Sequence, residues 1–94
     1  MNESEIVSIL QEIKDEQHTS PHETDTVLKK LIKQAEYYVN NCGPDIDYTT
    51  DLDARSLLKD HVLYARFGRL AEFEQKYGGA YAKLQAKYYK PASV

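Results

Sequence analysis

Apolar residues recur at helical spacing through the middle of the sequence, and this stripe constrains the fold more than any other feature. Between Asp25 and Cys42 they fall at positions i, i+3, i+4 and i+7 over about four turns. Asn41, Gly43 and Pro44 end the pattern, because glycine favours the position after a helix and proline cannot continue one. The segment predicts an amphipathic helix with one buried face. That face consists of Leu28, Leu31, Ile32, Ala35, Tyr38, Val39 and Cys42.

A shorter segment with the same periodicity precedes this helix. Residues 3–14 carry apolar residues at helical spacing, and Asn2 or Ser4 is placed to cap their first turn. Residues 15–25 are polar around Pro21, so we expect a loop there. The second helix would then open at Thr24, Asp25 or Thr26.

A third helical segment differs from the first two in being apolar on more than one side. It opens at Thr50 or Asp51 and runs to Tyr77, with a broad apolar face over residues 54–71 and further apolar area beyond it. Such a helix usually contacts more than one neighbour. The neighbour is either another copy of the chain or the remaining segments wrapped around the helix.

Two adjacent glycines, Gly78 and Gly79, interrupt the third segment. Together they cost about 2 kcal/mol in a helix interior relative to alanine, so we expect a break or kink and a short last helix from Tyr81 to Tyr89. The sequence thus predicts an all-α fold. It is a small bundle of about four helices, with a long central third helix and a short C-terminal helix after a Gly-Gly break. Residues 1–90 would form one domain, followed by a frayed tail at 91–94.

The composition indicates a cytoplasmic protein that gains stability by association. Cys42 is the single cysteine among 94 residues, which excludes an intrachain disulfide. The first residues lack the basic and apolar regions of a signal peptide, and no segment approaches the roughly 20 apolar residues of a membrane span. A chain this short has a thin core. Its 8 tyrosines suit either an interface or the edge of a helical core.

The charges are divided unevenly between the two halves of the chain. Residues 1–53 carry 12 acidic and 4 basic side chains, whereas residues 54–94 carry 3 acidic and 8 basic ones, so the net charges are −8 and +5. An acidic and a basic half suit head-to-tail contact between copies, or attraction of an acidic partner to one end. Ordinary solvated helix faces would give the same counts.

Two groups of residues contain potential metal ligands, but neither has the pattern of a metal site. His18 and His22 have a spacing that suits a metal on a helix, but they lie in a polar loop with no third ligand in evidence. The aspartates within residues 45–53 do not follow the ligand spacing of a calcium-binding EF-hand loop, and turns and helix caps account for them.

His61 is the remaining candidate for chemistry. No nucleophile accompanies it, so we expect a buried polar contact to Tyr38 or Tyr64 instead of a catalytic base. We therefore predict no catalytic residue, no cofactor and no metal, and a protein that is not an enzyme.

Four basic residues gather on the third segment. Arg55, Lys59 and Arg66 share one side of the expected helix, and Arg69 follows close behind. Phosphate contacts are conceivable for such a stripe, but a face that is solvated or contacts another subunit is favoured. Dedicated DNA recognition is disfavoured, because the total charge is acidic and no helix-turn-helix glycine turn is present.

The order of these segments resembles that of the head–tail connector proteins of long-tailed bacteriophages, also called adaptor or head-completion proteins. The likeness runs over roughly Ile6 to Tyr89. It consists of an amphipathic helix DTVLKKLIKQAEYYVNNCG, a short polar loop, the segment LLKDHVLYARFGRLAEFEQKY and a last helix AYAKLQAKYY. Its most telling stretch is LKDHVLYAR, from Leu58 to Arg66. The glycine pair and the acidic first half depart from what this family leads us to expect.

The resemblance implies a structural virion protein. Such subunits form a homo-oligomeric ring beneath the portal protein, extend the DNA channel, and offer a docking platform to tail or further connector proteins. DNA would pass through without sequence-specific binding, and no membrane would be involved. The candidates for contact with an adjacent subunit or with this channel DNA are Arg55, Lys59, Arg66 and Arg69. The protein would be found in the host cytoplasm during assembly and then at the head–tail junction of the virion. C-terminal segments of the family reach into the portal or a neighbouring subunit. Here that role falls to residues 80–94, with the candidate docking residues Tyr81, Leu84, Tyr88 and Tyr89.

A second class of function fits the same residues. A small helical regulator, of an anti-repressor or antitoxin-like kind, would bind one partner protein and form a dimer or a one-to-one complex instead of a ring. A nucleic-acid binder ranks behind both, and would need salt-sensitive DNA binding to support it.

Overall fold

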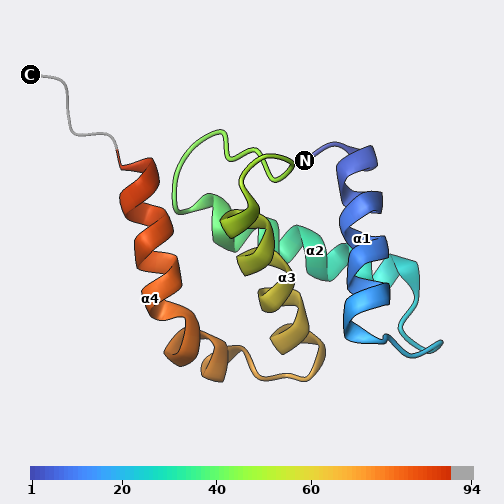
Figure 1. Ribbon diagram of the computed structural model, residues 1–94. Helices are drawn as coiled ribbons and strands as arrows, with labels where there is room; N and C mark the ends of the chain where they lie inside the picture. The colour runs from blue at the N-terminus through green and yellow to red at the C-terminus, as the bar shows by residue number, and fades with distance from the viewer. Residues whose placement is uncertain (90–94) are drawn as a thin grey trace, which may run out of the picture.

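Four α-helices make up the part of the chain that the computed structural model describes, residues 1–89 (Figure 1). These residues contain no strand, so the all-α prediction is confirmed. None of their helices is long and apolar enough to cross a membrane. The predicted tail at 91–94 lies outside the described residues. The helices are α1 (Glu3–Gln17), α2 (Asp25–Asn40), α3 (Leu52–Arg66) and α4 (Leu70–Tyr88).

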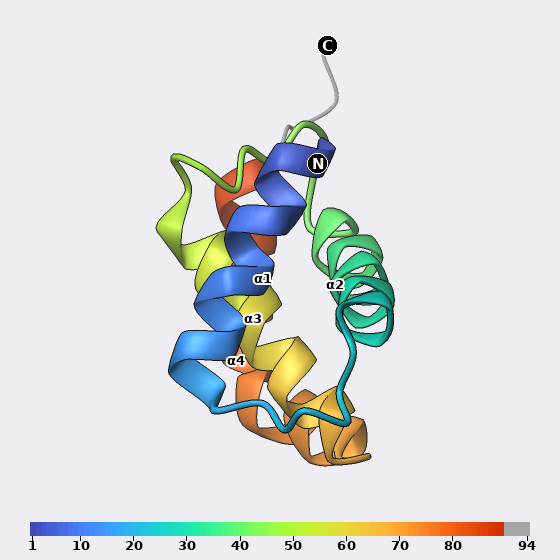
Figure 2. The same ribbon diagram turned by 90° about the vertical axis from the view of Figure 1, so that its right-hand side faces the viewer.

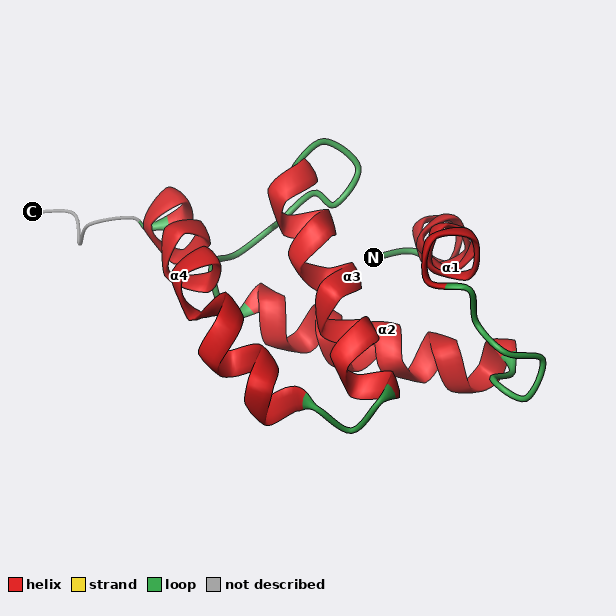
Figure 3. Cartoon of the chain, turned by 60° about the horizontal axis from the view of Figure 1, so that its bottom comes forward, coloured by secondary structure: helices red, strands yellow, loops and turns green. Residues whose placement is uncertain are grey.

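The helices form two layers. α1, α3 and α4 stand side by side in a row, and α2 crosses behind them (Figure 1). The view turned by 90° shows α2 as a separate layer (Figure 2), and the view from below shows α3 between α1 and α4 (Figure 3). α2 and α3 form the most extensive helix pair, while α4 packs mainly on α3. α4 therefore lies at one edge of the molecule.

One core cluster joins all four helices. The stripe predicted for α2 faces this core, as the spacing of its apolar residues requires. α4 contributes least, because only two of its residues are buried. The buried apolar residues are Ile6, Ile9, Leu10 and Ile13 from α1, Leu28, Ile32, Ala35 and Val39 from α2, Ala54, Leu57, Leu58 and Val62 from α3, Phe73 and Leu84 from α4, and Cys42 and Tyr48 from the α2–α3 connection.

Three helices begin at side-chain caps that were among the sequence candidates. Asn2 Oδ1 accepts a hydrogen bond from the Glu5 amide at 2.8 Å, and Thr24 Oγ1 accepts one from the Val27 amide at 3.3 Å. Asp51 Oδ1 caps α3 by accepting from the backbone amide of Ala54 at 3.1 Å. Each cap satisfies an amide that has no partner within its own helix. These three boundaries follow from local sequence alone.

The predicted long third helix is wrong, because α3 ends at Arg66. Gly68 adopts a left-handed conformation with φ of +67°. Its amide donates to the Ala65 carbonyl at 3.1 Å, and the Arg69 amide donates to the Tyr64 carbonyl at 2.8 Å. This pair of bonds is the Schellman motif that commonly ends a helix at glycine. The apolar face predicted over residues 54–71 includes Gly68, but in the structure this glycine ends the helix.

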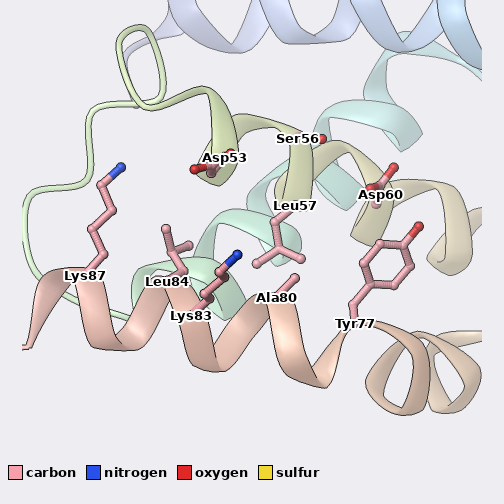
Figure 4. A pocket seen from close by; sticks show the side chains of 9 residues that line it. All are labelled: Asp53, Ser56, Leu57, Asp60, Tyr77, Ala80, Lys83, Leu84 and Lys87. Carbon is pink, nitrogen blue, oxygen red and sulfur yellow. The ribbon is translucent and has the colours of Figure 1, made fainter.

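Of the break or kink predicted at Gly78 and Gly79, the break is wrong, because α4 continues through both residues. Phe73 and Leu84 bury their side chains on either side of the pair. Tertiary packing of these two residues outweighs the low helix propensity of glycine. The helix axis does change direction near Tyr77, just before the glycines, where Figure 4 shows the preceding turns end-on.

The α2–α3 connection carries an aromatic residue that the sequence interpretation missed. Tyr48 is 1% exposed, and its hydroxyl donates a hydrogen bond to Asn40 Oδ1 at 2.7 Å. Burial raises the pKa of the Tyr48 hydroxyl. The polar residues around it gave the segment the pattern of a surface loop, so no local signal marked Tyr48 as a core residue.

Candidate protein interface

The basic side of α3 faces α1. Arg55 Nε donates to Glu12 Oε1 at 3.1 Å, and its Nη2 binds the other oxygen of the same carboxylate. The guanidinium also donates to the Tyr48 carbonyl and to Ser8 Oγ, each at 3.2 Å. Its side chain is only 13% exposed. Arg55 therefore joins α1, α3 and the loop before α3.

Lys59 extends this contact by one turn. Its Nζ donates to Glu12 Oε1 at 2.9 Å and to Glu16 Oε1 at 3.0 Å. The hydrogen bond from Arg55, aided by those from Lys59, lowers the pKa of Glu12 to about 2. Glu12 thus stays ionised and holds two cations of α3 against α1.

Arg66 fixes the connection between α1 and α2. Its Nε donates to Glu23 Oε1 at 2.6 Å and its Nη2 donates to Glu23 Oε2 at 2.9 Å, a two-point pair. Its Nη1 donates to Gln17 Oε1 at 3.0 Å. The side chain is 4% exposed, so this cation is unavailable to a partner.

Three of the four predicted contact residues are therefore engaged within the chain. Arg55, Lys59 and Arg66 do share one side, as their spacing predicts, but that side meets the acidic residues of α1 and its following loop. Much of the charge asymmetry between the two halves is satisfied inside one molecule. Arg69 lies apart from the other three and is 65% exposed, with Glu72 Oε1 at 3.8 Å from its Nε.

The candidate C-terminal docking residues divide in a similar way. Leu84 belongs to the core, and the Tyr81 hydroxyl donates to the Tyr38 carbonyl at 3.4 Å. The Tyr88 hydroxyl donates to Asp51, whose carboxylate raises the pKa of Tyr88 to about 12. Tyr89 alone of the four stays largely exposed, at 72%.

An aromatic cluster surrounds His61 at the meeting of α2, α3 and α4. The imidazole lies 4.8 Å from the Tyr38 ring and 5.1 Å from the Phe73 ring, centroid to centroid, so His61 meets Tyr38 by ring packing and not by the predicted polar contact. His61 is 7% exposed and its Nδ1 has no hydrogen-bond partner within residues 1–89. Burial lowers the pKa of His61, so the ring is neutral at pH 7. The described residues contain no group of three or more potential metal ligands.

The turn between α3 and α4 presents apolar side chains to solvent. Phe67 is 65% exposed and Leu70 is 38% exposed. The Arg66 guanidinium carbon lies 5.1 Å from the centroid of the Phe67 ring, which holds the aromatic ring beside a buried cation. We call Phe67, Arg69 and Leu70 the turn patch. Apolar residues grouped on a surface in this way commonly mark an interaction site.

A cleft of about 520 Å³ lies between α3 and α4 (Figure 4). Apolar side chains of Leu57, Ala80 and Leu84 form part of its lining. Asp53 from α3 and Lys83 from α4 also line it, and Figure 4 shows both pointing into the space between the two helices. The cleft therefore combines an apolar floor with charges of both signs. Sequence reasoning missed it, because the predicted boundary between the two helices was misplaced.

Comparison with known proteins gave no match to a family model, to a curated protein or to a solved structure.

Proposed function

We propose that this chain is a structural subunit of a bacteriophage head–tail junction. Copies would assemble beneath the portal, extend the DNA channel and provide a platform for tail or further connector proteins. The resemblance of Leu58–Arg66 and its flanking helices to connector proteins is the sequence support for this proposal. The structural observation that carries it is the pair of exposed apolar sites at the ends of α4: the turn patch and Tyr89.

Apolar groups left in water at both ends of one helix favour a role in docking. A chain of 94 residues has a small hydrophobic core. Phe67 and Tyr89 nevertheless contribute almost nothing to this core, because they are 65% and 72% exposed. Aromatic side chains are enriched at protein interfaces. Meanwhile the ion pairs of Arg55, Lys59 and Arg66 hold the subunit itself together. In our proposal Arg69 is the member of the basic group that meets a neighbour or channel DNA.

The proposal is tested by mass measurement of the chain alone and with the portal protein encoded in the same genome. We expect several copies of the chain on each portal ring. Replacing Phe67 and Tyr89 together by alanine should abolish this binding, whereas the matched change Val7→Ala, at an exposed apolar residue of α1, should not. Failure of the unaltered chain to bind portal rings would overturn the proposal. A one-to-one complex with some other protein would favour the regulator instead.

A further inference from the structure

The turn patch and the α3–α4 cleft lie toward opposite ends of the same helix pair. The turn patch follows the last residue of α3, whereas the cleft reaches back to Asp53 in the first turn of α3 and forward to Lys87 near the end of α4. One molecule cannot place its own turn patch in its own cleft. Two copies can meet in this way, and the pair then keeps one free cleft and one free turn patch for further copies.

The apolar parts of the two surfaces match. Phe67 exposes an aromatic ring that has little apolar cover of its own. The cleft offers exposed Ala80 and the small uncovered part of Leu57 and Leu84, each 4% exposed. Its volume of about 520 Å³ falls within the roughly 300–1,000 Å³ typical of pockets that enclose drug-sized ligands, so one phenylalanine side chain fits.

The charges match as well, in two pairs. The turn patch carries Arg69, with Glu72 one helical turn beyond it, and both side chains are more than half exposed. Across the cleft stand Asp53 on α3 and Lys83 on α4 (Figure 4). Within residues 1–89 neither Asp53 nor Lys83 forms an ion pair. The cleft thus presents an opposite charge for each member of the Arg69–Glu72 pair.

We propose that the turn patch of one copy docks in the α3–α4 cleft of a second copy. Phe67 would lie on the apolar floor, Arg69 against Asp53, and Glu72 against Lys83. The contact is heterologous, so repeated use generates a closed ring or an open filament. Its role as the joint between ring subunits rests on the proposed function, but the contact itself is a property of this chain.

Charge reversal tests the pairing directly. Arg69→Asp and Asp53→Arg each place like charges across the contact, and each variant alone should associate at least about tenfold more weakly than the unaltered chain. An equal mixture of the two variants should recover association. In the mixture the aspartate introduced on one variant meets the arginine introduced on the other, and the reverse contact has the original residues. Sedimentation velocity over a concentration series up to about 1 mM measures the association.

Two controls keep the result interpretable. Lys30→Asp reverses an exposed charge on α2, away from both surfaces, and should leave association unchanged. Circular dichroism establishes that each variant is folded. The proposal is overturned if the unaltered chain stays monomeric up to that concentration, if either reversal leaves association intact, or if the mixture associates no better than the separate variants.

The outcomes also separate this contact from the proposed function. If the chain binds portal rings but does not self-associate through the turn patch, the proposed contact is contradicted and the connector proposal still stands. If the chain self-associates through Phe67 but does not bind portal rings, the connector proposal is contradicted and the proposed contact still stands.

Discussion

The backbone of Gly43 lies directly against the side chain of Tyr88, although the two residues are separated by two helices in the sequence. A Cβ on residue 43 would stand 2.8 Å from Tyr88 Cγ and closer still to Tyr88 Cβ. Rotation of the tyrosine cannot relieve this clash, because its Cβ is fixed by the backbone of α4. Gly43 therefore lets the end of α4 approach the α2–α3 connection, where Tyr88 and Lys87 bind Asp51.

Gly43→Ala should loosen the last turns of α4. We expect a fall in the free energy of unfolding of about 1–3 kcal/mol, the usual cost of forcing extra atoms into a packed site. Urea denaturation measures the loss, and faster amide hydrogen exchange near Tyr88 locates it. Unchanged exchange in the last turns of α4 would contradict the proposed role of Gly43.

Gly79→Ala is the matched substitution with the opposite expected sign. The added methyl group would meet open space, and the residue lies within a continuous helix. Alanine should raise the free energy of unfolding by about 1 kcal/mol, because it has the higher helix propensity. The same urea denaturation experiment measures the gain. A loss of stability would mean that the bend in α4 requires glycine at this position.

Glu12→Gln should weaken the attachment of α1 to α3. The change removes the charge that pairs with Arg55 and Lys59, and we expect a loss of about 1–2 kcal/mol in the free energy of unfolding. Because folding lowers the pKa of Glu12 from 4.5 to about 2, its contribution is complete above pH 4.5 and is lost as the pH falls toward 2. Glu5→Gln on the same helix removes no such pair and serves as the control. Equal losses for both variants would contradict this account.

His61 should make the fold sensitive to mild acid. Burial holds its folded-state pKa below 6.5, so the folded protein binds fewer protons than the unfolded chain. The contribution of neutral His61 to the free energy of unfolding is then fully present above pH 6.5. It falls as the pH drops below that value. Tyr38 and Phe73 pack on the ring, and Glu74 partly offsets the shift in pKa through its charge. Urea denaturation between pH 5 and pH 7 measures the slope.

His61→Phe provides the test of that assignment. Phenylalanine keeps an aromatic ring in the cluster and cannot be protonated, so the stability of the variant should change little between pH 6.5 and pH 5. The Glu12 contribution does not interfere, because it is lost below pH 4.5. A variant that retains the full slope would assign the pH dependence to other groups.

Local sequence was sufficient for some boundaries and insufficient for others. The caps Asn2, Thr24 and Asp51 act within one helical turn, so their residue types predict them. The continuation of α4 through its two glycines required tertiary information, whereas the motif at Gly68 is local. Gly68 ends a helix because it is left-handed, whereas Gly78 and Gly79 lie within a helix that is anchored on both sides.

The candidate site shows the same division. The shared side of Arg55, Lys59 and Arg66 follows from helical spacing, but the identity of their partners depends on where α1 packs. The charge asymmetry of the sequence was consistent with contacts between copies and with contacts inside one copy. Many of these charges pair within one molecule. Tyr48 gave no periodic signal at all, because it lies in a connection and is buried by the fold around it.

The polar contacts between α1 and α3 join residues 42 to 49 positions apart, and this separation has a consequence for synthesis. A ribosome makes the acidic helix α1 first and the basic helix α3 only after α2. During that interval Glu12 and Glu16 lack the cations that they bind in the folded chain. Chains released before Arg66 is added lack the residue that fixes the α1–α2 connection. The ionic contacts between α1 and α3 therefore form late in translation, once α3 has emerged.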